Sequence, residues 1–241
     1  MNNYKSSFLD SIPPIVKNLI AINIILWLAT LALPNILSRW GLNIDLTDSL
    51  GMHYWASDKF NPAQLITYIF MHAGFNHIYF NMFALYMFVG VLEQLWGPKR
   101  FLFYYLVTGV GAGIIQQLFW AIEFQSALTT INDAIAANSI DTLSLIAQKK
   151  MFVDSLITVG ASGSVFGLLL AFGWLFPEAK MMLIFFPVPI KARIFVVLYG
   201  FIELFMGVAR FSGDSVAHFA HLGGMLFGAI LILYWKKKNR L

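Results

Sequence analysis

The chain has 241 residues, of which 59% are hydrophobic and only 12% are charged, and its net charge is +4. These proportions exclude an ordinary soluble domain and are typical of an integral membrane protein. The basic residues are dispersed between apolar runs, which argues against a nucleic-acid-binding face, and the absence of cysteine excludes disulfides, thiol catalysis and thiolate metal sites.

Six apolar runs approach the length that crosses a bilayer, roughly 20 residues. They fall at about 18–34, 76–93, 101–122, 160–176, 192–209 and 216–235. They predict an all-α polytopic membrane protein, with six transmembrane helices forming one domain over residues 1–241. No short apolar core with a small-residue cleavage site precedes the first run, so we expect that run to remain in the mature protein.

The second run has two possible starts, because the apolar segment 65–74 precedes it. A helix from Gln64 would contain about 30 residues, more than a bilayer requires. We therefore expect this helix to start near Asn76.

Two segments differ from the spans around them. Residues 123–155 are far more polar, with apolar residues at helical intervals, and we expect an amphipathic insertion outside the bilayer between the third and fourth spans. Residues 181–193 are apolar but too short to span, and Pro187 and Pro189 exclude a regular helix interior. We expect this stretch to lie along the membrane interface.

The distribution of lysine and arginine sets the orientation. With the N-terminus inside, the inner segments hold eleven of the sixteen basic residues. The positive-inside rule then predicts that both termini are cytoplasmic. We expect a multi-pass protein of a bacterial inner membrane, whose partners are the lipid bilayer and membrane proteins rather than nucleic acid.

Polar groups within membrane spans are costly and are functional candidates by default. Those near the start of the second, fourth and sixth predicted helices are His77, Asn81, Ser162, His218 and His221. In the predicted topology these three helices all enter from the outer side. Their polar groups therefore lie at the same depth.

This set of residues permits nucleophilic chemistry. Ser162 needs an adjacent base, for which the imidazole of His218 or His221 is suited. The oxyanion of a tetrahedral intermediate needs hydrogen-bond donors, which His77, Asn81 and the backbone N–H of Ser162 could supply.

Small residues at four-residue spacing allow helices to approach closely. Such stripes are Gly163 and Gly167 in the fourth span and Ala220, Gly224 and Gly228 in the sixth. The stripes are common in membrane helices, and a lone serine often bonds to its own helix backbone, so neither identifies a site alone.

A metal site or transporter built on the histidines is a competing hypothesis. The chain lacks a His-Glu-xx-His motif, and no acidic residue accompanies the histidines on their helices. We therefore expect no metal and no cofactor, and we expect His53 and His72 to have packing roles.

Several motifs together resemble the rhomboid family of intramembrane serine proteases. His77 and Asn81 match the family's His-xxx-Asn, and residues 90–106 match its Glu-xxx-Gly-xx-Arg-Phe junction. The sequence around Ser162 matches Gly-x-Ser-Gly, and that around His221 matches Ala-His-xx-Gly-xxx-Gly. The resemblance implies a dyad of Ser162 and His221, since His218 lacks the family spacing.

The resemblance also implies supporting roles close to the dyad. Phe166, four residues after the serine, would stack on His221. Gly160 would leave room beside the oxyanion, while Gly163 and Gly224 would let the fourth and sixth helices touch.

The implied activity is hydrolysis of peptide bonds in or near transmembrane segments of single-span membrane proteins. The alternative is an inactive rhomboid-like protein that binds transmembrane segments without cleaving them. Glu203 lies in the fifth span, beside the family's lateral substrate gate. It either pairs with a polar group near the site or faces water.

Overall fold

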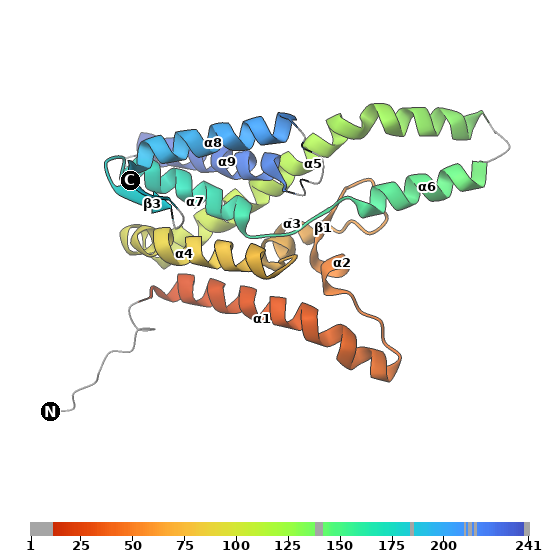
Figure 1. Ribbon diagram of the computed structural model, residues 1–241, viewed down its shortest axis with the longest axis horizontal. Coiled ribbons are helices and arrows are strands. Elements are labelled where there is room, and N and C mark those ends of the chain that lie inside the picture. The colour runs from red at the N-terminus through yellow and green to blue at the C-terminus, as the bar shows by residue number, and fades with distance from the viewer. Residues whose placement is uncertain are drawn as a thin grey trace.

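The computed structural model describes residues 12–137, 142–183, 186–209, 211, 214 and 216–238 (Figure 1). Its helices are α1 (Pro14–Leu37), α2 (Leu46–Leu50), α3 (Gln64–Thr67), α4 (Phe75–Trp96), α5 (Pro98–Ala136), α6 (Thr142–Ser155), α7 (Ser162–Leu175), α8 (Ala192–Ala209) and α9 (His218–Lys237). The 3-10 helices are η2 (Ser38–Trp40) and η3 (Tyr68–Phe70). Two antiparallel two-stranded sheets pair β1 (Met52–His53) with β2 (Ile157–Thr158), and β3 (Lys180–Leu183) with β4 (Phe186–Lys191).

The six predicted spans are all helical, as α1, α4, α5, α7, α8 and α9, and the all-α fold class is confirmed. Among the described residues, four helices are long and apolar enough to cross a membrane, and α4 is a fifth if its bent halves form one span. The remaining helix, α7, has only 14 residues. It contacts α4, α5, α8 and α9, so protein surrounds it and the bilayer does not set its length.

The second span starts where we expected. Residues 64–70 form α3 and η3 within the first loop, and α4 begins at Phe75 after an extended Gly74. The predicted third span, about 101–122, lies within α5. Helix α5 continues to Ala136 because residues 123–136 contain neither glycine nor proline to stop it.

The polar insertion is a helical hairpin formed by the end of α5 and by α6 (Figure 1). It extends away from the rest of the bundle (Figure 1). The side chain of Ser57 in the first loop donates a hydrogen bond to Asp154 of α6, and Lys150 pairs with Asp58 at 2.6 Å. The insertion is therefore tied to the first loop at its base.

The stretch that we expected along the interface contains the β3–β4 hairpin. The two prolines that exclude a helix lie in β4, where a two-stranded sheet leaves one edge unpaired and tolerates the missing N–H. The hairpin connects α7 to α8.

Helices α7 and α9 are in backbone contact. A Cβ on Gly224 would overlap the carbonyl group of Gly163, and a Cβ on Gly228 would overlap the hydroxyl of Tyr104. That hydroxyl donates a hydrogen bond to the carbonyl of Gly167 at 2.8 Å. The glycine stripes thus bring the start of α7 against the start of α9.

Glu93, in the junction between α4 and α5, anchors the first helix. Its carboxylate is 2% exposed and accepts hydrogen bonds from the backbone N–H groups of Ile15 and Val16, both at 2.9 Å. First-turn amides have no partner within their own helix, so Glu93 supplies one to α1.

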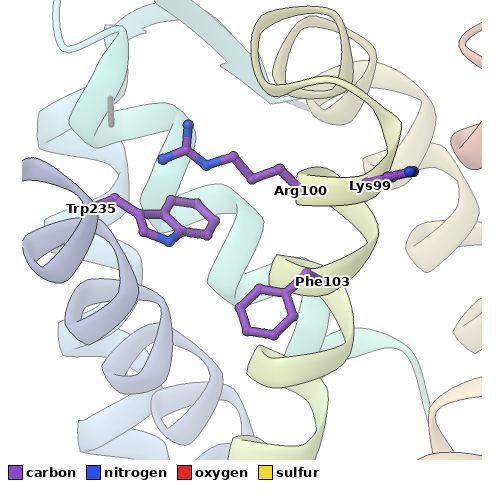
Figure 2. A pocket seen from close by; sticks show the side chains of 4 residues that line it. All are labelled: Lys99, Arg100, Phe103 and Trp235. Carbon is purple, nitrogen blue, oxygen red and sulfur yellow. The ribbon is translucent and has the colours of Figure 1, made fainter. Parts of the chain in front are cut away.

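A basic pocket of about 540 Å³ lies at the same end of the bundle, where α5 begins and α9 ends. Figure 2 shows its lining residues, Lys99, Arg100, Phe103 and Trp235. The Arg100 guanidinium lies 4.0 Å from the centre of the Trp235 ring, a cation–π distance. At a rise of 1.5 Å per residue, this pocket is about 20 Å along α9 from His221.

Candidate active site

The segment before α7 is held in an extended conformation by the first loop. Strand β2 pairs with β1, and the N–H of Gly160 donates to the carbonyl of Tyr68 at 2.9 Å. Gly160 has φ of 133°, which favours glycine, and a Cβ there would lie 2.6 Å from Nε2 of His77. Glycine is therefore required by both backbone conformation and space, and it brings α4 beside the start of α7.

Ser162 is the first residue of α7, and its Oγ lies 2.8 Å from Nε2 of His221 on α9. The His221 side chain is buried, with the residue 8% exposed. The ring of Phe166 lies parallel to the imidazole, with 4.2 Å between centroids and 7° between planes. Stacking of this kind fixes the plane of the imidazole, so that Nε2 points at the serine.

A carboxylate lies on the other side of His221. Oε2 of Glu203 is 2.8 Å from Nδ1 of His221 and 2.6 Å from Nδ1 of His218. Nε2 of His218 is in turn 2.9 Å from Oδ2 of Asp214. A continuous chain of hydrogen bonds thus runs from Ser162 to the loop before α9.

Glu203 faces the bundle rather than the lipid. The buried residues of α8 are Ala192, Val196, Glu203 and Gly207, whose spacing places them along one face of the helix. The sequence alone leaves the orientation of Glu203 open, and the family spacing favours His221 over His218. The available indication was a single acidic residue in an otherwise apolar span.

The two predicted side-chain donors to the oxyanion, His77 and Asn81, make different contacts. The ring of His77 lies next to Gly160, as described above, and packs edge-on against His72 with 5.0 Å between centroids. The side-chain amide of Asn81 is buried and donates to the carbonyl of His77, four residues earlier in its own helix, at 2.9 Å.

Glu203, His218 and His221 are also the described residues whose ligand atoms converge closely enough for a metal, within 4.8 Å of one another. The same three atoms lie within hydrogen-bond distance along the chain described above. The arrangement therefore suits proton positioning.

Other polar residues near the site have packing partners. His53 is fully buried, with Nε2 2.9 Å from the carbonyl of Asp48. Ser164 donates to the carbonyl of Tyr105 on α5 at 2.8 Å, away from His221. His72 is also buried, although its contact with His77 places it at the edge of the site.

A cavity of about 230 Å³ adjoins the far end of the hydrogen-bonded chain. Residues that line it include Gln116, Phe119, Glu123, Met206, Asp214 and His218. It lies between α5, α8 and the start of α9. The His218 ring therefore has one side toward Glu203 and another toward this cavity.

Comparison with known protein families identifies the family to which the chain belongs. A model of the rhomboid domain matches residues 59–238, which include every residue of the candidate site. The chain belongs to the rhomboid family. It is therefore an integral membrane protein with a rhomboid fold.

The rhomboid relatives are distant. The chain is 28% identical to Rhomboid-like protein 11, chloroplastic, of Arabidopsis thaliana over 70% of its own length and 51% of the relative. It is 27% identical to Rhomboid protein 1, mitochondrial, of Saccharomyces cerevisiae, over 73% of its own length and 43% of the relative. The chain is also 29% identical to a Bacillus subtilis rhomboid relative, YdcA, over 40% of its own length and 46% of the relative. The chain thus spans about half the length of these relatives.

Proposed function

We propose that this rhomboid protein is a serine endopeptidase that hydrolyses peptide bonds in or near the transmembrane segments of single-span membrane proteins. The observation that supports this most is the 2.8 Å distance between Ser162 Oγ and His221 Nε2. A serine hydroxyl becomes an effective nucleophile when a base within this distance takes its proton.

The reaction would take place in two stages. The oxygen of Ser162 attacks the scissile carbonyl carbon while Nε2 of His221 takes the hydroxyl proton. His221 then gives that proton to the leaving amine as the C–N bond breaks, which leaves an acyl-enzyme. Water, deprotonated by His221, attacks the ester, and the proton returns to Ser162 as the acid product leaves.

The oxyanion of each tetrahedral intermediate needs donors fixed in advance. We assign this role to the backbone N–H of Ser162, which is free as a first-turn amide of α7, and to the side chains of His77 and Asn81. The absence of a side chain on Gly160 leaves space between His77 and the serine. Gly163 and Gly224 keep the two dyad helices in contact.

The position of the site near one end of the bundle suits this substrate class. A transmembrane helix hides its carbonyl groups in internal hydrogen bonds, so it must unwind locally before attack. Unwinding and the supply of water are both easier near a membrane surface than at the bilayer centre.

We further propose that the protein lies in a bacterial inner membrane with both termini in the cytoplasm, and that the 123–155 hairpin is outside the bilayer. The lysine and arginine distribution supports this orientation. Two relatives are named as chloroplastic and mitochondrial, so family membership alone does not select the compartment. The reaction needs no cofactor or metal.

The rhomboid family also includes inactive members, which bind transmembrane segments without cleaving them. An inactive protein has no need of a serine aligned with a histidine, a stacked aromatic ring and a buried carboxylate. The alignment of Ser162, His221 and Phe166 therefore favours the protease.

A fluorophosphonate probe tests the nucleophile directly, because it reacts with activated serines. We expect the purified protein to be labelled at Ser162, Ser162→Ala to be unlabelled, and His221→Ala to react at least about 100-fold more slowly. Ser164→Ala is the matched control and should react like the wild type, since Ser164 bonds to Tyr105. Equal labelling of Ser162→Ala and the wild type would overturn the proposal.

A further inference from the structure

Glu203 extends the proposed dyad. We propose that Glu203 is a positioning residue that holds His221 in the tautomer and orientation needed for base catalysis, and that His218 keeps Glu203 ionised. This inference rests on the proposed function and goes beyond it, since a Ser-His dyad alone assigns no role to the fifth span.

The hydrogen bonds fix the tautomer of His221. A carboxylate only accepts hydrogen bonds, so the contact of 2.8 Å with Glu203 puts a proton on Nδ1 of His221. Nε2 is then free to accept the proton of Ser162, which lies 2.8 Å away. The opposite tautomer would leave Nε2 protonated and unable to act as the base.

The same reasoning gives the charge of His218. Both of its ring nitrogens face carboxylate oxygens, at 2.6 Å from Glu203 and 2.9 Å from Asp214. Two acceptors require two donors, so His218 is an imidazolium. It therefore provides a positive charge directly beside the buried carboxylate.

A charge at Glu203 requires such a partner. The residue is 4% exposed, and an ionised carboxylate without compensation is costly in this environment. His218 provides the compensating charge, and the N-terminal end of α9, where both histidines lie, adds a favourable dipole. Glu203 stays negative at little cost.

Asp214 connects this arrangement to the surface. The hydrogen bond from His218, together with one from the backbone N–H of Val216, lowers the pKa of Asp214 below its usual range. The cavity of about 230 Å³ also reaches His218 and Asp214. Protons and water can thus equilibrate with His218 without passing Ser162.

During catalysis, the Glu203 carboxylate would act only through His221. When Nε2 takes the serine proton, His221 becomes an imidazolium, and the nearby negative charge stabilises it. Glu203 itself keeps no proton. The titratable side chains that face His221 in the described structure are Glu203 on α8, His218 on α9 and His77 on α4.

Glu203→Gln tests the role, because glutamine still accepts a hydrogen bond but carries no charge. We expect kcat for a single-span substrate to fall about 10- to 100-fold, with KM within about twofold of the wild type. The acid limb of the kcat/KM profile should move to lower pH, since the His221 imidazolium loses its partner charge. Glu178→Gln is the control, because its carboxylate pairs with Lys191 and Arg193 at the surface.

A merely structural role would give a different result. If Glu203 served only to attach α8 to α9, Glu203→Gln would lower the melting temperature or raise KM, and the acid limb would stay in place. An unchanged kcat and pH profile in a folded Glu203→Gln variant would also overturn the inference.

Nitrogen-15 NMR of the wild type, labelled at histidine, separates this inference from the proposed function. We expect His221 to carry its proton on Nδ1 and His218 to carry two protons at pH 7. A neutral His218, or a His221 protonated on Nε2, would overturn the inference whether or not the protein cleaves a substrate. Failure of Ser162→Ala to abolish labelling would instead overturn the proposed function.

Discussion

The space that a Cβ on Gly160 would fill is bordered by Nε2 of His77 and by Oγ of Ser162, and we propose that His77 donates a hydrogen bond to the oxyanion there. Loss of one such donor typically costs about 100-fold or more in rate. We therefore expect His77→Ala to lower kcat by about 100-fold while KM changes little, as measured by substrate cleavage. Tyr79→Ala, an exposed position on the same helix, is the control and should retain activity. Equal kcat in the wild type and His77→Ala would remove His77 from the mechanism.

The lowered pKa of Asp214 predicts how the free energy of unfolding depends on pH. A carboxyl group whose folded pKa is below its unfolded value, about 3.9, stabilises the protein above that value and loses this effect as pH falls through the folded pKa. Thermal unfolding of the wild type and Asp214→Asn should differ by about 1 kcal/mol or less between pH 5 and 7. The difference should shrink as the pH falls from 5 towards the lowered pKa of Asp214, and a difference that stays constant over that range would contradict the assignment.

Ser162 and His221 can be identified from the sequence, whereas the role of Glu203 becomes visible only in the structure. Ser162 and His221 stand in local motifs, with glycines at fixed spacing, so the sequence around each one identifies it. Glu203 has no such motif, and its partners lie 15 and 18 residues away on another helix. Only the packing of α8 on α9 brings them together. The family spacing favours His221 over His218 and does not reveal the contact between His218 and Glu203.

At the scale of elements, the contact between α7 and α9 holds the site together. Gly224→Ala would push the two helices apart, because the new methyl group meets the backbone of Gly163. We expect a loss of about 1–3 kcal/mol in stability and loss of fluorophosphonate labelling. Gly200→Ala is the matched control in α8, where the new methyl group meets the flexible end of Met225 at 3.4 Å. Similar behaviour of both variants would contradict the close contact.

The boundaries of the helices were only partly predictable from the sequence. The excessive length of a helix from Gln64 predicted the late start of α4. The change to polar residues after residue 122 indicates where the chain leaves the bilayer, but it does not show that the helix continues to Ala136, because helix formation depends on backbone propensity as well as on hydropathy. The β3–β4 hairpin likewise depends on pairing between two short segments, which the apolar pattern of 181–193 does not reveal.

At the scale of the whole molecule, the predicted orientation determines which compartment the site faces. The chain has no cysteine, so a single introduced cysteine can be labelled without background. We expect Leu143→Cys, exposed on the insertion, to react with an impermeant thiol reagent in spheroplasts. Lys238→Cys, at the end of α9, should react only after the membrane is broken. The reverse labelling pattern would show that the orientation in the membrane is opposite to the predicted one.

Cleavage of a transmembrane substrate that depends on Ser162 is the most direct test of the proposed function. Purified protein in liposomes should cut a tagged single-span substrate within or next to its transmembrane segment, as mass spectrometry of the fragments would show. Ser162→Ala should give no fragment above background, because without the hydroxyl there is no nucleophile for His221 to activate. Cleavage at the same bond and rate by Ser162→Ala would contradict the proposed function, as would no cleavage of single-span substrates by unlabelled wild-type protein from a preparation that reacts with the fluorophosphonate probe.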